Sequence, residues 1–493
     1  MQTYKMLIGG EWVEAANGET FETFNPYTGE AWANIPRGRA EDADRAVQAA
    51  SRAFEDGEWS RMNATARGHI MRRLGDLITE NAQHLAEIEV RDNGKLLSEM
   101  LGQTRYVPQW FHYFGGLADK LQGAVIPIDK ANTFNFTRHE PLGVCVAITA
   151  WNSPLLLAAY KLGPGLAAGN TFVLKPSEFT SASALEFGKL AEQAGLPPGV
   201  INIVTGFGAE VGEPLVAHPK VAKVAFTGSE MGGQRVYETA ARGLKRVTLE
   251  LGGKSPNIVF GDAKLENAVK GVVGGILGAT GQTCVAGSRL LVQRKIHDEF
   301  VERVVDFART AKLGDPMERT TQIGPVTTPP QYQKVLHYID VAKQEGAKCL
   351  LGGGPAPHPA GGNTSQFVQP TIFGDVRNDM RIAQEEVFGP VLACIPFEDE
   401  AEALAIANDS PYGLAAGLWT QDMNRVLRMS ERLRTGMVWV NMYRAVSYMS
   451  PFGGAKRSGV GSENGAEAIL DYVRSKSVWI STAEETPDPF VLG

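Results

Sequence analysis

Cys284 is the residue of this chain whose setting best suits nucleophilic chemistry. It ends the run Gly281-Gln282-Thr283-Cys284, shortly before an apolar strand predicted near Leu290. A cysteine among small residues at a turn can have a lowered pKa, because backbone amides stabilise its thiolate. A buried structural cysteine would also fit this local pattern. Other residues must therefore decide between the two interpretations.

Glu250 and Asn152 offer two further reactive groups. Glu250 follows the apolar stretch 247–249 and enters the glycine-rich turn 251–254. A carboxylate at the end of a strand in an α/β sheet lies where ligands bind, and it could deprotonate a water. A surface or ion-paired glutamate is the alternative. Asn152 stands where the strand predicted at 144–149 meets a helix, so its amide could either donate to an oxyanion or cap that helix.

Two turns could hold a nucleotide. Phe226-Thr227-Gly228-Ser229 follows a predicted strand, and Gly233 is expected to open the next helix, whose N-terminal amides could meet a pyrophosphate. The full GxGxxG spacing is absent. Lys175 and Glu178 follow another predicted strand and could bind ribose hydroxyls. A solvated turn would explain them equally well.

These residues are embedded in alternating strands and helices. Strands are expected at 144–149, 171–174, 200–204 and 221–226, and helices at 154–168, 181–194 and 233–242. This alternation is typical of a parallel sheet covered on both faces. A second α/β region is expected from Asn257 to about Val440, with helices at 299–311 and 330–345. The sequence therefore predicts an α/β protein with two domains and a cleft between them.

The two ends of the chain are expected to add simpler elements. A short hairpin is predicted over 5–13, and polar helices over 41–55 and 64–80. The stretch 471–480 is predicted to be extended and apolar. It could pair with another subunit, because the exposed edge of a sheet needs covering.

Length and composition limit the remaining possibilities. A chain of 493 residues exceeds what one core usually fills, so two or three domains are expected. The net charge of -7 gives no reason to expect nucleic acid or an acidic membrane surface as a partner. No apolar run is long enough to cross a bilayer, and no secretion signal is recognised. The four cysteines form no CxxC pair, so we expect no metal site and a reducing, cytoplasmic location.

In this order and spacing, the segments together resemble the aldehyde dehydrogenase family. Further family segments occur at 314–316, 323–325, 385–390 and 451–454, and the resemblance runs from about residue 8 to residue 480. It implies a Rossmann-type NAD-binding domain over 1–122 and 141–252, and a catalytic domain over 253–455. It also implies a small β arm for oligomerisation, formed by 123–140 and 456–493, and hence a homodimer or homotetramer.

The resemblance also assigns roles to individual residues. Cys284 matches the nucleophile, Glu250 the general base, and Asn152 the oxyanion-hole side chain, acting with the Cys284 backbone amide. The expected NAD-binding residues are Trp151, Lys175, Glu178, Gly228, Ser229, Gly233, Leu251, Glu386 and Phe388. The implied reaction is oxidation of an aldehyde to a carboxylic acid through a cysteine thiohemiacetal and thioester. NAD is expected rather than NADP, because the Glu178 carboxylate would repel a 2′-phosphate.

The expected substrate pocket departs from that of many relatives. Its lining is predicted to comprise Ser153, Leu157, Tyr160, Thr283, Val285, Met442, Arg444, Val446 and Phe452. Ser153, Gly274 and Gly278 are small where relatives are often bulky, which indicates a wider or more polar pocket. Arg444 could bind a carboxylate through its planar fork, or could instead point to solvent or pair with a neighbour. A polar, aromatic or carboxylate-bearing aldehyde is therefore expected.

Three other functions fit parts of the sequence. A coenzyme-A-acylating dehydrogenase is the nearest, but that branch generally lacks the glutamate base. A catalytically inactive structural or binding homologue would have no need of Cys284, Glu250 and Asn152 together. An esterase acting through Cys284 would not need the nucleotide-binding residues. NAD-dependent aldehyde oxidation accounts for more of the residues than any of these.

Overall fold

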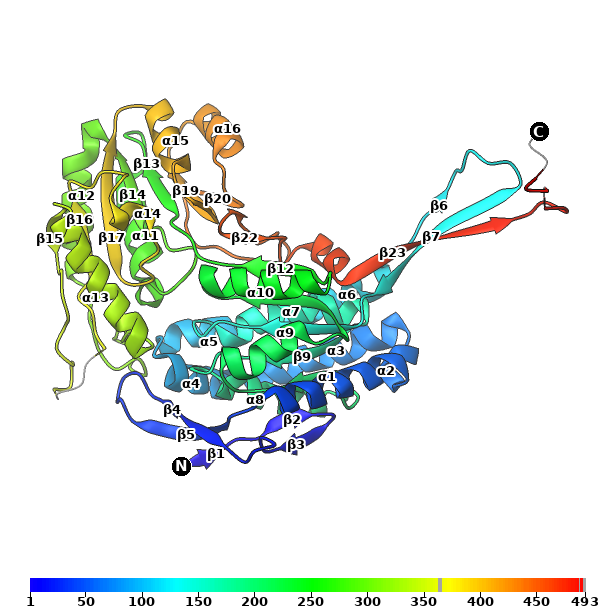
Figure 1. The fold of residues 1–493 in the computed structure, drawn as a ribbon. Coiled ribbons are helices and arrows are strands. Elements are labelled where there is room, and N and C mark those ends of the chain that lie inside the picture. Colours follow the sequence, from blue (N-terminus) through cyan, green and yellow to red (C-terminus); the bar gives the residue numbers. More distant parts are fainter. Residues whose placement is uncertain (362–365, 487, 491–493) are drawn as a thin grey trace.

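The protein is described by a computed structural model that covers residues 1–361, 366–486 and 488–490 (Figure 1). Its N-terminal segment forms two small strand pairings. β2 (Met6–Ile8) and β3 (Glu11–Val13) are antiparallel, which confirms the predicted hairpin. β1 (Gln2–Thr3), β5 (Ala31–Pro36) and β4 (Thr20–Phe24) make a separate three-stranded sheet. Both lie at the lower edge of the molecule in Figure 1.

An eight-stranded sheet forms the first of two α/β layers. In spatial order it comprises β22 (Gly459–Val460), β12 (Arg246–Glu250), β11 (Val221–Thr227), β8 (Val144–Ile148), β9 (Thr171–Lys175), β10 (Ile201–Ile203), β2 and β3. The run from β12 to β10 is parallel. Every residue of β8 and β9 is buried, as expected for strands covered on both faces. The four predicted strands are confirmed.

Helices cover both faces of this sheet. They are α1 (Ala40–Glu55), α2 (Glu58–Arg61), α3 (Ala64–Glu80), α4 (Ala82–Asn93), α5 (Leu97–Tyr106), α6 (Pro108–Leu117), α7 (Pro154–Ala168), α8 (Ala182–Gln193), α9 (Glu213–Ala217) and α10 (Glu230–Arg242). The prediction that Gly233 opens a helix is wrong. α10 begins at Glu230, because the Ser229 side chain accepts the Gly232 amide and caps the first turn.

A seven-stranded sheet forms the second layer. Its spatial order is β15 (Lys348–Leu351), β16 (Thr371–Gly374), β17 (Val391–Phe397), β14 (Arg289–Gln293), β13 (Pro256–Val259), β19 (Ala415–Trp419) and β20 (Met437–Val440). The accompanying helices are α11 (Leu265–Leu277), α12 (His297–Arg309), α13 (Pro329–Gln344), α14 (Arg381–Gln384), α15 (Glu400–Asn408) and α16 (Met423–Arg432). The second α/β region is thus confirmed, with α12 starting two residues earlier than predicted.

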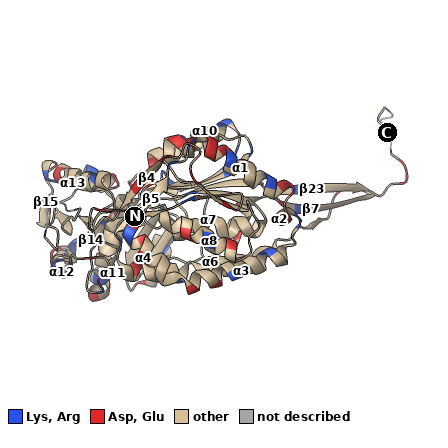
Figure 2. Cartoon of the chain, turned by 90° about the horizontal axis from the view of Figure 1, so that it is seen from below, with Lys and Arg blue, Asp and Glu red and all other residues tan. Residues whose placement is uncertain are grey.

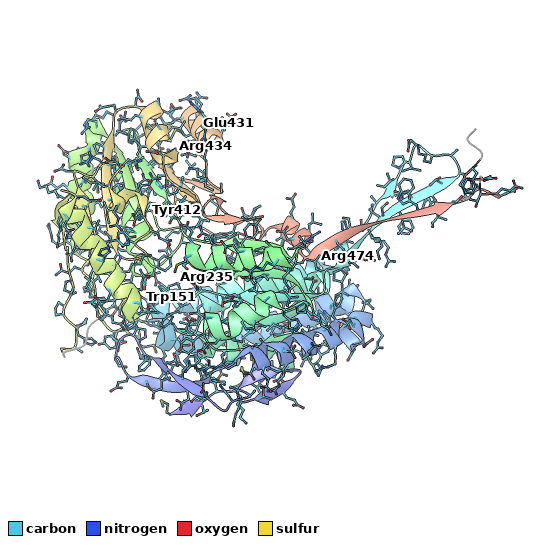
Figure 3. All side chains as sticks on the ribbon, in the orientation of Figure 1. Trp151, Arg235, Tyr412, Glu431, Arg434 and Arg474 are labelled. Atoms are coloured by element: carbon cyan, nitrogen blue, oxygen red, sulfur yellow. The ribbon has the colours of Figure 1, made fainter. Side chains whose placement is uncertain are left out.

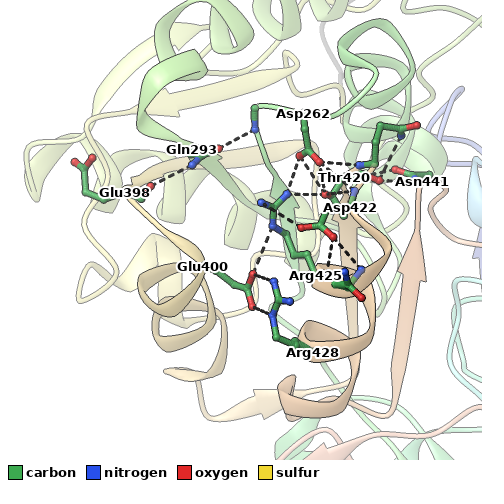
Figure 4. A network of polar contacts seen from close by, with 12 residues as sticks. Asp262, Gln293, Glu398, Glu400, Thr420, Asp422, Arg425, Arg428 and Asn441 are labelled. Atoms are coloured by element: carbon green, nitrogen blue, oxygen red, sulfur yellow. Dashed lines mark hydrogen bonds and ion pairs between the residues drawn. The ribbon is translucent and has the colours of Figure 1, made fainter.

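Polar contacts join α16 to α15 and to the segment after β13 in the second layer (Figure 4). Arg425 on α16 donates to Asp262, which follows β13, and its guanidinium lies 4.2 Å from the centre of the Phe260 ring. Arg428 donates to Glu400 at the start of α15. Acidic and basic residues are mixed along the outer helices (Figure 2). Among the described residues, no helix is long and apolar enough to cross a membrane.

A three-stranded antiparallel sheet projects from the body (Figure 1). It pairs β6 (Val125–Ile126) with β7 (Thr133–Pro141), and β7 with β23 (Val473–Ser481). The extended segment predicted near the C-terminus is present, although its strand begins at Val473. β18 (Tyr412–Gly413) pairs with β21 (Ala455–Lys456) between the two layers. The Tyr412 hydroxyl donates to Glu230, which joins this junction to α10.

Candidate active site

A cavity of about 720 Å³ lies where the carboxyl ends of β8, β9, β11 and β12 face the second layer. Ligands of open α/β sheets bind at this edge. Trp151 and Arg235 (Figure 3) contribute to its wall from the end of β8 and from α10. Of the residues predicted from the sequence, it is lined by Trp151, Asn152, Leu157, Lys175, Glu178, Gly228, Ser229, Leu251, Cys284, Glu386 and Phe388.

Cys284 follows a tight turn that precedes β14. Ala279 and Thr280 adopt left-handed φ values of 55° and 54°, which L-residues rarely accept. The Glu99 carboxylate accepts the Ala279 amide at 2.7 Å and so helps to hold this turn. The backbone of Ala279 and Thr280 is strained, because both residues adopt the left-handed conformation. Such strain is often retained where a side chain must be presented to a ligand.

The pKa of Cys284 is raised, whereas the local sequence pattern allowed for a lowered pKa. Burial raises the pKa of the thiol to about 12, and the nearby carboxylates of Glu250 and Glu386 contribute further to the rise. The backbone amides of Cys284 and Val285 oppose the rise, as the sequence led us to expect, but they are outweighed. The thiol is therefore protonated at neutral pH in this structure and has to lose its proton before it can attack.

The Asn152 side chain reaches the same turn from the end of β8. Its amide nitrogen donates to the Gln282 carbonyl at 3.0 Å, which leaves the second N–H of that amide for another acceptor. Asn152 is only 8% exposed and lines the cavity together with Cys284. Two segments separated by 130 positions thus meet at the cavity floor.

Glu250 lies buried beside this pair, at the end of β12. Neither of its carboxylate oxygens has a hydrogen-bond partner in the described structure. Burial raises the pKa of Glu250 well above its usual value, and the Glu463 carboxylate adds to that rise. Glu250 is not among the residues that line the cavity, although its charge influences the Cys284 thiol.

A buried ion pair near Glu250 was missed by the sequence reasoning. The Lys161 ammonium on α7 donates to Glu463 and to the Thr227 hydroxyl, each at 2.6 Å. Its positive charge opposes the rise in the Glu250 pKa. A single lysine within the otherwise apolar helix 154–168 could have indicated a buried ion pair. Its partner, 302 positions away, could not have been identified from the local pattern.

The predicted nucleotide-binding residues occupy the rest of the cavity wall. Lys175 and Glu178 form an ion pair at 3.5 Å. Glu386 is partly buried, and it accepts the Gly253 amide at 3.0 Å. The rings of Phe388 and Trp151 meet edge to face, with their centres 5.3 Å apart. The cavity is also lined by residues that the sequence reasoning did not single out, among them Gln331, Lys334 and Arg235.

The two glycines predicted to face a phosphate donate their backbone amides to carbonyl groups of the protein. The Gly228 amide donates to the Glu250 carbonyl at 3.1 Å, and the Gly233 amide donates to the Ser229 carbonyl at 2.9 Å. Gly233 does not line the cavity. It lies against the Leu251 side chain, which leaves no space for a β-carbon. The lack of a side chain at position 233 therefore allows α10 to pack closely against Leu251, directly after β12. Ser229 and Gly232 line the cavity instead.

Eight of the nine predicted substrate-pocket residues fall into three groups. Tyr160, Val285 and Phe452 belong to one buried cluster, and Val446 packs against it. Leu157 lines the cavity. Ser153 and Thr283 are at least partly buried, whereas Met442 is 49% exposed. Trp110, which the sequence reasoning missed, stacks on Tyr160 with ring centres 5.0 Å apart.

Arg444 follows β20 in a left-handed conformation, with φ of 65°. Its guanidinium donates to the Gly274 carbonyl at 3.1 Å, near the end of α11. It also occupies the space that a side chain at position 278 would need, so Gly278 accommodates Arg444. Arg444 thus fills the space beside Gly278, whereas the space beside Gly274 stays open. One of the Arg444 nitrogens is committed to a protein carbonyl.

Comparisons with known proteins agree with the motifs. The aldehyde dehydrogenase family model matches residues 12–478. The mitochondrial aldehyde dehydrogenase of Homo sapiens is 45% identical over 98% of this chain and 92% of its own. (Z)-2-((N-methylformamido)methylene)-5-hydroxybutyrolactone dehydrogenase of Acinetobacter baylyi is 43% identical over the full length of both.

Solved structures are equally similar. An NAD+ complex of aldehyde dehydrogenase from Bacillus cereus has a TM-score of 0.95 and 44% identity, covering 97% of each chain. Betaine aldehyde dehydrogenase from Staphylococcus aureus, solved with NAD+, has a TM-score of 0.96 and 40% identity, covering 99% of this chain and 97% of its own. The resemblance read from the ordered motifs is confirmed, and the chain belongs to the aldehyde dehydrogenase family.

Proposed function

We propose that the protein oxidises an aldehyde to a carboxylic acid with NAD, using Cys284 as the nucleophile. The observation that carries this proposal is the convergence of three distant segments: Cys284 and Asn152 line one large cavity, and the buried Glu250 carboxylate is close enough to raise the pKa of the Cys284 thiol. A thiol, an amide donor and a carboxylate are the groups that such a reaction needs.

In the first step the Cys284 sulfur attacks the aldehyde carbon, and the carbonyl oxygen gains negative charge. The free N–H of Asn152 and the Cys284 backbone amide are the donors we assign to that oxyanion. Both belong to fixed elements, because Asn152 is held by the Gln282 carbonyl. Preorganised donors of this kind stabilise the transition state more than the ground state.

The cavity residues fit NAD. Lys175 and Glu178 lie at one wall and offer a donor and an acceptor to a ribose, and Glu386 offers a partly buried carboxylate to the other ribose. Ser229 and Gly232 stand at the N-terminal end of α10, where helix amides favour a pyrophosphate. When bound, NAD supplies the hydride acceptor. The Bacillus and Staphylococcus structures were both solved with NAD+.

Glu250 is proposed to deprotonate the water that hydrolyses the Cys284 thioester. Its raised pKa suits this role, because a carboxylate with a pKa nearer to neutrality is a stronger base once ionised. Neither carboxylate oxygen is engaged by a protein donor, so both remain available as hydrogen-bond acceptors. The product is then a carboxylic acid. Transfer of the acyl group to coenzyme A would not need a base for water, so the presence of Glu250 favours hydrolysis.

The substrate is proposed to be a polar, aromatic or carboxylate-bearing aldehyde. Leu157 lines the cavity that also holds Cys284, and the buried stack of Tyr160 and Trp110 belongs to the apolar cluster that packs against Cys284. Arg444 offers the remaining donors of its guanidinium to a carboxylate. The Acinetobacter relative is named for a polar, functionalised substrate.

We further propose a homo-oligomer assembled through the projecting sheet of β6, β7 and β23. Its exposed apolar side chains include Phe134, Trp479 and Ile480. The domain division is proposed as predicted, with the projecting sheet as the arm. A cytoplasmic location is consistent with four unpaired cysteines. The human relative is named mitochondrial.

The test is NADH formation by the purified protein with a panel of neutral, aromatic and carboxylate-bearing aldehydes. Cys284→Ala should abolish it, and adding coenzyme A should not accelerate it. Turnover that persists in Cys284→Ala would refute the assigned nucleophile. Turnover that requires coenzyme A would favour the acylating alternative, and NAD binding without turnover of any aldehyde would favour an inactive homologue.

A further inference from the structure

Lys95 lies buried directly beneath the turn that carries Asn152. It stands in the loop between α4 and α5 and is 1% exposed. Its ammonium donates to the Asn152 carbonyl at 2.7 Å and to the Ser153 hydroxyl at 3.0 Å. Ser153, predicted as a pocket residue, thus serves as an acceptor for this lysine. An apolar side chain at position 153 would remove that contact.

The same turn is held from its other side by Glu89. This buried carboxylate on α4 accepts the Leu155 amide at 2.9 Å, at the start of α7. It also accepts the Ser183 hydroxyl at 3.3 Å. Lys95 and Glu89 therefore fix the backbone on both sides of Ser153, while the Gln282 carbonyl fixes the Asn152 side chain. Each of these contacts limits the directions in which the Asn152 amide can point.

The charge of Lys95 has no close counterion. Among the described residues, no carboxylate oxygen lies within 4.0 Å of its ammonium. Glu99 and Glu89 attract it from α5 and α4, Arg444 repels it from the segment after β20, and a thiolate at Cys284 attracts it. An incompletely neutralised cation in a site of low dielectric favours negative charge on neighbouring groups.

We propose that Lys95 is a positioning residue of the oxyanion hole, which holds Asn152 through its backbone and favours the anionic forms at Cys284. This inference rests on the proposed roles of Cys284 and Asn152. Burial lowers the pKa of Lys95 to about 8, against the attraction of Glu99. The cationic form predominates below that pKa, so its electrostatic contribution should be present at neutral pH and disappear as pH rises through about 8.

The test compares Lys95→Met with Lys223→Met. Lys223 is also 1% exposed, but it lies on β11 beside the Tyr472 ring and does not line the cavity, so it controls for the loss of a buried lysine. Both changes are made in a Cys349→Ala background, because Cys349 is an exposed thiol that would obscure the readout. Steady-state kinetics and the rate of Cys284 alkylation by iodoacetamide are measured across pH.

Lys95→Met should lower kcat by at least about tenfold, the scale of loss when catalytic groups are misplaced, with KM for NAD unchanged. Alkylation should slow below pH about 8 and approach the rate of the background protein above it. Lys223→Met should retain both kcat and the alkylation profile. A soluble Lys95→Met with unchanged kcat, or with reduced kcat and an unaltered alkylation profile, would overturn the proposal.

A second variant covers the case in which Lys95→Met does not fold. Lys95→Gln keeps an N–H donor but removes the charge, so it should fold and show the same change in alkylation profile. An unaltered profile in that variant would equally overturn the proposal. Cys284→Ala separates the two levels of inference. If it kept NADH formation, the assigned nucleophile would fail, whatever the Lys95 variants showed.

Discussion

The side-chain amide of Asn152 donates to the carbonyl of Gln282 across 3.0 Å, two positions before Cys284. Gln282 is itself held, because its side-chain oxygen accepts the Thr327 amide at 2.9 Å. The amide is thus fixed by the same turn that carries the thiol. Any displacement of this turn would move the thiol and the proposed oxyanion donor together.

Replacing Asn152 by alanine should lower kcat by about 10²- to 10³-fold, the usual loss when one oxyanion donor is removed. NAD affinity, measured by fluorescence titration, should stay unchanged. Asn202→Ala is the matched control, because Asn202 is also buried and donates to the Phe172 and Gly199 carbonyls away from the cavity. If the two variants lost activity to the same extent, the special role of Asn152 would be refuted.

Glu250→Gln should separate the two halves of the reaction. Hydride transfer precedes hydrolysis, so this variant should release about one NADH per active site in a rapid burst and then turn over slowly. Stopped-flow absorbance measures the burst, and mass spectrometry should detect the acyl group on Cys284. A variant with neither burst nor acylated protein would show that Glu250 acts before the thioester forms.

The pH dependence of the reaction should respond to Glu463. Its carboxylate raises the pKa of Glu250, and it also neutralises Lys161, whose charge lowers that pKa. Glu463→Gln should therefore lower the Glu250 pKa for both reasons. Because the ionised carboxylate is the active base, the acid limb of the kcat profile should move to lower pH. A limb displaced to higher pH would contradict this account of the electrostatics.

The elements that depend on local hydrophobic patterning could be predicted from the sequence. Helix 154–168 ends where its apolar run ends, and helices 64–80 and 154–168 both occur with the predicted bounds. The buried strand 144–148 arises from a continuous apolar run between polar turns. The order of motifs was enough to group Cys284 with Asn152 at one site.

Features that depend on tertiary surroundings could not be predicted in this way. The direction of the Cys284 pKa shift could not be read from the local pattern, because burial and the Glu250 charge outweigh the amides visible there. Gly233 was misplaced because the helix begins at Glu230, directly after its cap at Ser229. Lys95 could not be recognised at all, since its acceptors lie 57 and 58 positions away in the chain.

Arg444→Leu should distinguish substrates by charge. KM for an aldehyde that carries a carboxylate should rise by about tenfold or more, as expected for loss of a charge-assisted hydrogen bond. KM for the uncharged aldehyde of the same length should change little. Arg434→Leu, on the exposed surface (Figure 3), controls for the loss of positive charge. An equal rise in KM for both aldehydes would mean that Arg444 only supports the Gly274 backbone.

The projecting sheet should carry the subunit contact. Trp479 is 56% exposed and Ile480 45% exposed, which is unusual for such side chains on the strand of a small sheet unless another surface covers them. Trp479→Glu should therefore reduce the assembly to a smaller species in multi-angle light scattering. Ser481→Glu adds the same charge to an exposed position of the same strand and should leave the mass unchanged. If Trp479→Glu kept the original mass, the contact between subunits would have to lie on another face.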